Sequence, residues 1–217
     1  PQGRSTETVF ATNKVIRNTY MLLSMTLLFS AVTAGISMLY NVPHPGVVVT
    51  LVVYFGLLFL TAALRNSAWG ILSVFALTGF MGLTLGPILN AYVNTFTNGT
   101  QLVMTALGGT GAIFIGLSAY ALTTKKDFSF MGGFLMVGIL VAFLAGIASL
   151  IFAMPTLHLV VSGMFVLLMS GYILYQTSLL VHGGERNYIM ATVSLYVSIY
   201  NLFLSLLHLL AVFTGRE

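Results

Sequence analysis

Polar side chains recur along one face of the last apolar segment, Tyr188–Phe213, and are the first candidates for chemistry. They follow one another at steps of four, three, four and three residues: Ser194, Ser198, Asn201, Ser205 and His208. On a helix, this spacing places them on a single face. Because hydrocarbon leaves such groups unpaired, the pattern predicts a helix whose polar face contacts protein or water. We expect this helix to lie at the centre of the fold, surrounded by the others.

The chemistry open to this face is limited. Gln176 of the preceding segment falls at a depth similar to Ser194, counting ~1.5 Å of rise per residue, so the two segments can share a polar cluster. Such a cluster could bond helices together or line a path for an ion. His208 is the one titratable group of the series, and we expect it to be an interfacial or packed residue rather than a proton relay.

The sequence gives little support for an enzyme, a cofactor site or a metal site. The four histidines lie far apart in the sequence, there is no cysteine, and no zinc-protease motif is present. Val160-Val161-Ser162-Gly163 lacks the leading glycine of an intramembrane serine protease motif. We therefore predict no catalytic, cofactor-binding or metal-binding residues.

Composition indicates an all-α membrane protein. Of the 217 residues 58% are hydrophobic and only 6% charged, whereas about a quarter of a soluble domain is charged. Apolar runs close to the ~20 residues that cross a bilayer predict seven transmembrane helices in a single domain, 19–213. The predicted helices are 19–40, 47–64, 70–91, 102–123, 128–153, 157–181 and 188–213.

Basic residues predict the orientation in the membrane. All but one of the eight lie before the first helix or in the second, fourth and sixth linkers, which places the N-terminus in the cytoplasm and residues 214–217 outside. Their spread along the chain forms no patch for nucleic acid. The cytoplasmic tail, 1–18, is polar and is expected not to fold by itself. The basic residues are Arg4, Lys14, Arg17, Arg65, Lys125, Lys126, Arg186 and Arg216.

Small residues recur at helix-packing intervals in three segments. Each series predicts a ridge along which another helix approaches closely. In the third segment the series ends at Gly86-Pro87, where proline should kink the helix and free a carbonyl one turn earlier. The three series are Gly79, Gly82 and Gly86; Gly108, Ala112 and Gly116; and Gly138, Ala142 and Gly146.

Several stretches together resemble the Bax inhibitor (TMBIM) family of seven-helix membrane proteins, over nearly the whole chain. The family-like stretches are Gly86–Leu89, Thr124–Phe130, Tyr172–Tyr175, Ser194–Tyr196 and Tyr200–Phe203. Two others, Lys14–Tyr20 and His182–Ser194, are similar to the bacterial YccA-type branch. The resemblance implies a bundle with the seventh helix at its centre, in a bacterial inner membrane.

Two functions are implied by the resemblance. YccA-type proteins are implied to bind and restrain the membrane protease FtsH, within its complex with HflK and HflC, through a cytoplasmic tail that here includes Arg4, Ser5, Thr6, Glu7 and Thr8. Other members are calcium leak channels with an aspartate pair, whose positions here hold Gln176 and Ser198. Both carboxylates are missing, so the two positions cannot titrate as coupled acids. We expect a protease modulator first, and a cation leak channel as the alternative. The oligomeric state is left open.

Overall fold

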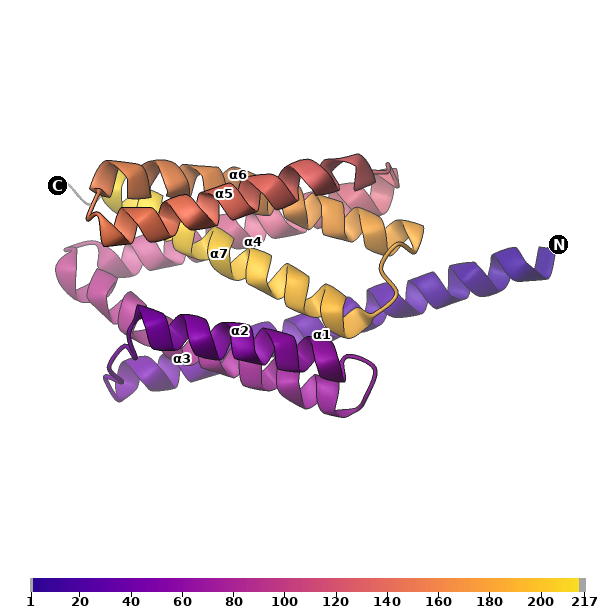
Figure 1. Cartoon of the computed structure of the whole chain (residues 1–217), viewed down its shortest axis with the longest axis horizontal. Coiled ribbons are helices and arrows are strands. Elements are labelled where there is room, and N and C mark those ends of the chain that lie inside the picture. The colour runs from indigo at the N-terminus through magenta and orange to yellow at the C-terminus, as the bar shows by residue number, and fades with distance from the viewer. Residues whose placement is uncertain (1, 215–217) are drawn as a thin grey trace. The chain divides into compact units, whose positions relative to one another are not determined.

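The computed structural model describes the backbone of residues 2–214 and the side chains of residues 11–214. Over this range all regular secondary structure is helical, and each of seven long helices contains a segment apolar enough to cross a membrane (Figure 1). The elements are α1 (Gln2–Leu39), α2 (Val47–Leu64), α3 (Trp69–Thr95), α4 (Gly99–Thr124), η1 (Ser129–Met131), α5 (Gly132–Ile151), α6 (Pro155–His182) and α7 (Tyr188–Thr214). The predicted class, an all-α protein with seven membrane-spanning helices, is confirmed.

Two helix starts differ clearly from the predicted ones. The helical backbone of α1 begins at Gln2 rather than at residue 19, because no proline or glycine between Arg4 and Asn18 stops the helix from extending beyond the apolar segment. α5 begins at Gly132 rather than at residue 128. There, side-chain oxygens of Ser178 and Asp127 accept the N–H groups of Phe128 and Ser129, and these bonds favour a turn over an α-helix.

The helices group into two compact units. Within the described residues, unit 1 comprises 2–94 and 185–196, and unit 2 comprises 95–184 and 197–214. α7 therefore contributes its first turns to unit 1 and the rest to unit 2. The single domain and the central position of α7 remain predictions.

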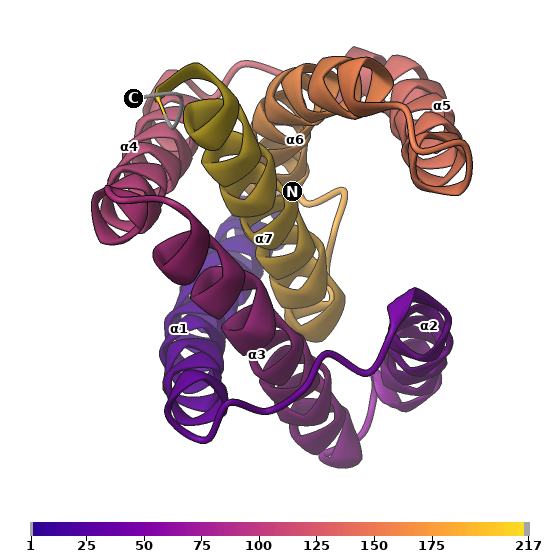
Figure 2. The same ribbon diagram turned by 90° about the vertical axis from the view of Figure 1, so that its left-hand side faces the viewer.

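In unit 1, α3 lies between α1 and α2 (Figure 2). The predicted glycine ridge of α3 packs against α1: a Cβ at Gly79 would lie 2.7 Å from the Phe29 ring, and a Cβ at Gly82 would overlap Thr33. Gly86 has the same relationship to Ser37. The backbones of α1 and α3 thus approach closely at Gly82 and Gly86, whereas a side chain at Gly79 would require the Phe29 ring to move.

In unit 2, the two predicted ridges of small residues, which have the same spacing, pack differently. On α5, a Cβ at Gly138 would lie 2.7 Å from Leu168 of α6, so this ridge packs as predicted. On α4, Gly108 and Gly116 are exposed, with open space where a Cβ would stand, so the prediction of close packing there is wrong. α4 instead turns Thr110 and Ala106 inward, because its buried face lies on the other side of the helix.

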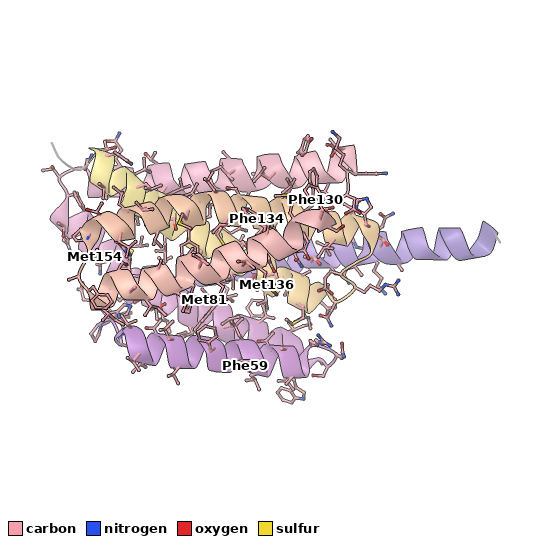
Figure 3. All side chains as sticks on the ribbon, turned by 45° about the horizontal axis from the view of Figure 1, so that its top comes forward. Phe59, Met81, Phe130, Phe134, Met136 and Met154 are labelled. Atoms are coloured by element: carbon pink, nitrogen blue, oxygen red, sulfur yellow. The ribbon has the colours of Figure 1, made fainter. Side chains whose placement is uncertain are left out.

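Large apolar side chains cover the outside of both units. Phe59 of α2 and Phe134 and Met136 of α5 are each 74% exposed, whereas Met81 of α3 is buried (Figure 3). A soluble domain rarely exposes so many large apolar groups. Their exposure on helices of membrane-crossing length indicates surfaces that face lipid.

Candidate functional site

The polar residues of α7 lie in protein surroundings to different extents. Ser198 and Ser205 are buried, and Ser194, Asn201 and His208 are half-buried. Asn201 turns its amide back onto its own helix and donates to the Val197 carbonyl at 2.8 Å. One of the two amide hydrogens of Asn201 is therefore used within α7 rather than between helices.

The start of α7 is fixed in unit 1 by Asn187. Its side-chain oxygen accepts the N–H of Met190 at 3.0 Å, which caps the helix. The amide nitrogen donates to the Arg65 carbonyl and to the Asn66 side chain, both at 3.0 Å. One side chain therefore caps α7 and ties it to the α2–α3 linker.

A buried tyrosine, which the sequence pattern did not single out, bonds three helices of unit 1. Tyr196 of α7 is 1% exposed, and its hydroxyl lies 2.6 Å from the Ser30 hydroxyl of α1 and 3.3 Å from the Thr78 carbonyl of α3. The tyrosine O–H donates to the carbonyl and accepts from the serine, so each group is satisfied. A buried tyrosine needs such a partner for its hydroxyl, and this requirement is the signal that could have identified it.

A second histidine lies beside His208, although the four histidines are far apart in the sequence. In unit 2 its Nδ1 lies 2.8 Å from the Ser162 hydroxyl of α6, and its ring meets the His158 ring edge-on at 4.4 Å between centroids. His158 in turn contacts the Ser149 hydroxyl of α5 at 3.1 Å through Nδ1. Two Ser–His contacts and one ring contact therefore join α5, α6 and α7.

The Ser162–His208 distance is one that a nucleophile and its base would show. However, the Ser162 hydroxyl also bonds the His158 carbonyl at 3.0 Å, as a serine inside a helix commonly does. A hydroxyl has one hydrogen, so both contacts are satisfied when His208 donates from Nδ1 and Ser162 acts as acceptor. In this arrangement the contact joins α6 and α7, and the serine hydrogen is directed at the His158 carbonyl rather than at the His208 ring.

Gln176 of α6 and Ser198 of α7 both belong to unit 2 and are almost fully buried, at 3% and 1% exposure. Both are neutral, and the described residues contain no group of three or more His, Cys, Asp or Glu that could hold a metal ion. Buried neutral groups of this kind require hydrogen bonds but no counter-charge. Their direct contact and their part in any ion path remain predictions.

The kink at Gly86-Pro87 remains a prediction, but the structure shows which groups lie around the proline. Pro87 lies inside α3 and has no N–H to bond the carbonyl of Leu83, four residues earlier. Ser37 of α1 donates to that carbonyl at 2.7 Å.

The side chains of the proposed protease-engagement tail, Arg4 to Thr8, lie outside the described residues.

Seven apolar helices, lipid-facing side chains and buried neutral hydrogen bonds define a multi-pass helical membrane protein. The family described as inhibitor of apoptosis-promoting Bax1 matches residues 12–215. The chain therefore belongs to the Bax inhibitor family, as the sequence motifs predicted.

Curated relatives match along almost the full length. The modulator of FtsH protease YccA of Escherichia coli K12 is 51% identical over 209 residues, which are 96% of this chain and 94% of the relative. An uncharacterized protein of Pseudomonas aeruginosa is 55% identical over 203 residues, 94% of this chain and 91% of the relative. An uncharacterized membrane protein of Vibrio cholerae is 42% identical, with 98% and 96% covered.

Proposed function

We propose that this chain is an inner-membrane modulator of the FtsH protease, with a binding role rather than a catalytic one. The similarity to a relative named for that role carries the proposal: half of all aligned residues are identical over nearly both full chains. The same protein in a second Escherichia coli strain is named an inner membrane protein, which supports the location.

The proposed mechanism has two parts. The cytoplasmic tail, residues 1–18, offers FtsH a segment to grip, and the membrane helices behind it resist extraction. Two features of unit 1 support this resistance. The α1–α3 contact excludes side chains at Gly82 and Gly86, and Ser37 bonds a carbonyl of α3 directly. Pulling α1 out first would expose the Leu83 carbonyl to hydrocarbon, at a cost on the order of several kcal/mol. The chain would occupy the protease and so spare other membrane substrates, within assemblies that also hold HflK and HflC.

The test is a pull-down of FtsH from native membranes, with the full chain and with a variant that lacks residues 1–13. We expect the truncated variant to lose FtsH and to leave client turnover unaffected by its expression. Equal recovery of FtsH by both forms, with client turnover slowed equally by both, would contradict engagement through the tail.

A second measurement separates the binding of the tail by FtsH from the resistance of the membrane helices to extraction. Gly82→Ala should loosen the α1–α3 contact and so raise the rate at which FtsH degrades the full chain, without changing FtsH recovery. Gly108→Ala is the matched control, because a Cβ at Gly108 meets open space. Equal degradation rates for the two variants would sink the resistance part of the mechanism.

A further inference from the structure

The linker between α4 and η1, Lys125 to Phe128, is held by two side chains of α6 that lie one turn apart. Ser178 accepts the Phe128 N–H at 2.9 Å and donates to the Lys126 carbonyl at 3.2 Å. His182 places Nε2 3.0 Å from the Lys125 carbonyl and Nδ1 2.9 Å from the Ser178 carbonyl. Three backbone groups of the linker are thus bonded to the end of α6.

Both ring nitrogens of His182 face carbonyl oxygens, which only accept hydrogen bonds. A neutral imidazole carries one N–H and can satisfy one of these acceptors, whereas the imidazolium ion carries two and satisfies both. The geometry around His182 therefore matches the protonated ring.

Each neutral tautomer weakens the hold on the linker. With the hydrogen on Nδ1, the bond from His182 to the Lys125 carbonyl is lost. With the hydrogen on Nε2, Nδ1 becomes an acceptor, and the nearest hydroxyl is that of Ser178 at 3.5 Å. That hydroxyl has a single hydrogen, which it donates to the Lys126 carbonyl, so the two acceptors compete for it.

The carboxylate of Asp127 is a charged neighbour of His182. Hydrogen bonds from Ser129, and to a smaller extent the charge of His182, hold the pKa of Asp127 below its usual value, so this neighbouring carboxylate is ionised. The ring also lies in the last turn of α6, where the helix dipole favours positive charge. The other elements packed here, α4, η1 and α5, carry no Asp, Glu, Lys or Arg. The remaining charged or titratable side chains of this end are Lys125, Lys126, Tyr120, Tyr175 and, just after α6, Glu185 and Arg186.

We infer that His182 and Ser178 form a proton-dependent clamp on the Lys125–Phe128 linker. The clamp is closed when both ring nitrogens of His182 carry a hydrogen, and it loosens when one of these hydrogens is lost. Two stretches that carry the family resemblance, Thr124–Phe130 and His182–Ser194, meet at this point. The clamp is independent of FtsH binding and concerns the exposure of this linker.

The Phe128 amide reports on the clamp directly, because its hydrogen is bonded to Ser178 outside any helix. We would measure its hydrogen exchange in the full chain in nanodiscs at pH 5.5 and 8.0. The result is expressed as a protection factor, which removes the intrinsic pH dependence of exchange. Losing about one hydrogen bond should lower protection roughly fivefold at the higher pH. The Ser67 amide, bonded within the α2–α3 linker, is the internal control and should not change.

His182→Gln supplies an uncharged side chain that still donates hydrogen bonds, so its Phe128 protection should be the same at both pH values. Ser178→Ala removes the acceptor of the amide and should give low protection throughout. Protection in the unmodified chain that is equal at pH 5.5 and 8.0 would overturn the inference. So would a pH dependence that persists in His182→Gln.

Discussion

Ser37 of α1 donates its hydroxyl hydrogen to the carbonyl oxygen of Leu83 in α3, at 2.7 Å. That oxygen is the one that Pro87 leaves without an intrahelical donor. Pro87 and the serine on the other helix therefore act on the same carbonyl, and the two residues can be tested together.

Ser37→Ala should destabilise the protein by about 1–2 kcal/mol, because the Leu83 carbonyl loses its donor. Thermal unfolding in nanodiscs measures the cost. In a Pro87→Ala background the helix regains its own N–H donor, so the same serine substitution should cost much less. An equal cost in both backgrounds would show that the serine does not act through the freed carbonyl.

Gly82→Ala should destabilise the protein by about 1–3 kcal/mol, since its Cβ would overlap Thr33 and the Ser30 carbonyl. The expected change in unfolding temperature is a decrease. Gly108→Ala adds the same methyl group where nothing lies within 4 Å, and it should leave the unfolding temperature nearly unchanged. Ala has a higher helix propensity than Gly, so a similar decrease in both variants would show that the α1–α3 contact is not the cause.

Ser162 and His208 should show a coupling of about 0.5–1.5 kcal/mol in a double-mutant cycle with Ser162→Ala and His208→Leu. The free energy of unfolding of the two single variants and the double variant supplies the number. Additive effects, with no coupling, would mean that the 2.8 Å contact contributes nothing to holding α6 and α7 together.

Replacing Gln176 and Ser198 by aspartate should make stability depend on pH. Both sites are nearly fully buried, and a buried carboxylate without a partner costs more free energy than the neutral acid. The protein should therefore be less stable at higher pH, where the charged form of a carboxyl group is favoured. Unfolding temperatures from pH 5 to 8 should decrease for this variant more than for Gln176→Leu with Ser198→Leu. The same slope in both would indicate that these positions reach water.

Asp127 should contribute to stability only above the acid range. Hydrogen bonds from Ser129 lower its folded-state pKa below the unfolded value near ~3.9, so its contribution is present above that pH and is lost as the pH falls. Asp127→Asn removes the titration. Its unfolding temperature should therefore drop less between pH 5 and 3 than that of the unmodified chain, and an identical drop would contradict the assignment. The carboxylate is fully exposed, so we expect a small difference.

The local sequence pattern was sufficient to predict the helices and to identify a backbone group that lacks a hydrogen-bond partner within its own helix. Runs of about 20 apolar residues must form helices in a membrane, because only helices satisfy their own backbone groups there. In the same way, Pro87 by itself implied a carbonyl without a donor. The family motifs added the protein class, which the comparison with known proteins confirmed.

Only the tertiary structure decided which groups meet. The ridges of α3, α4 and α5 look alike in the sequence, yet α3 and α5 turn theirs inward and α4 turns its glycines outward. Likewise, Ser37 is 46 residues from Leu83, and His208 is 46 residues from Ser162. Helical periodicity defines which residues share a face, but it carries no information about which neighbour that face will contact. That choice depends on how whole helices pack, and so the polar face of α7 could be read from the sequence while its partners could not.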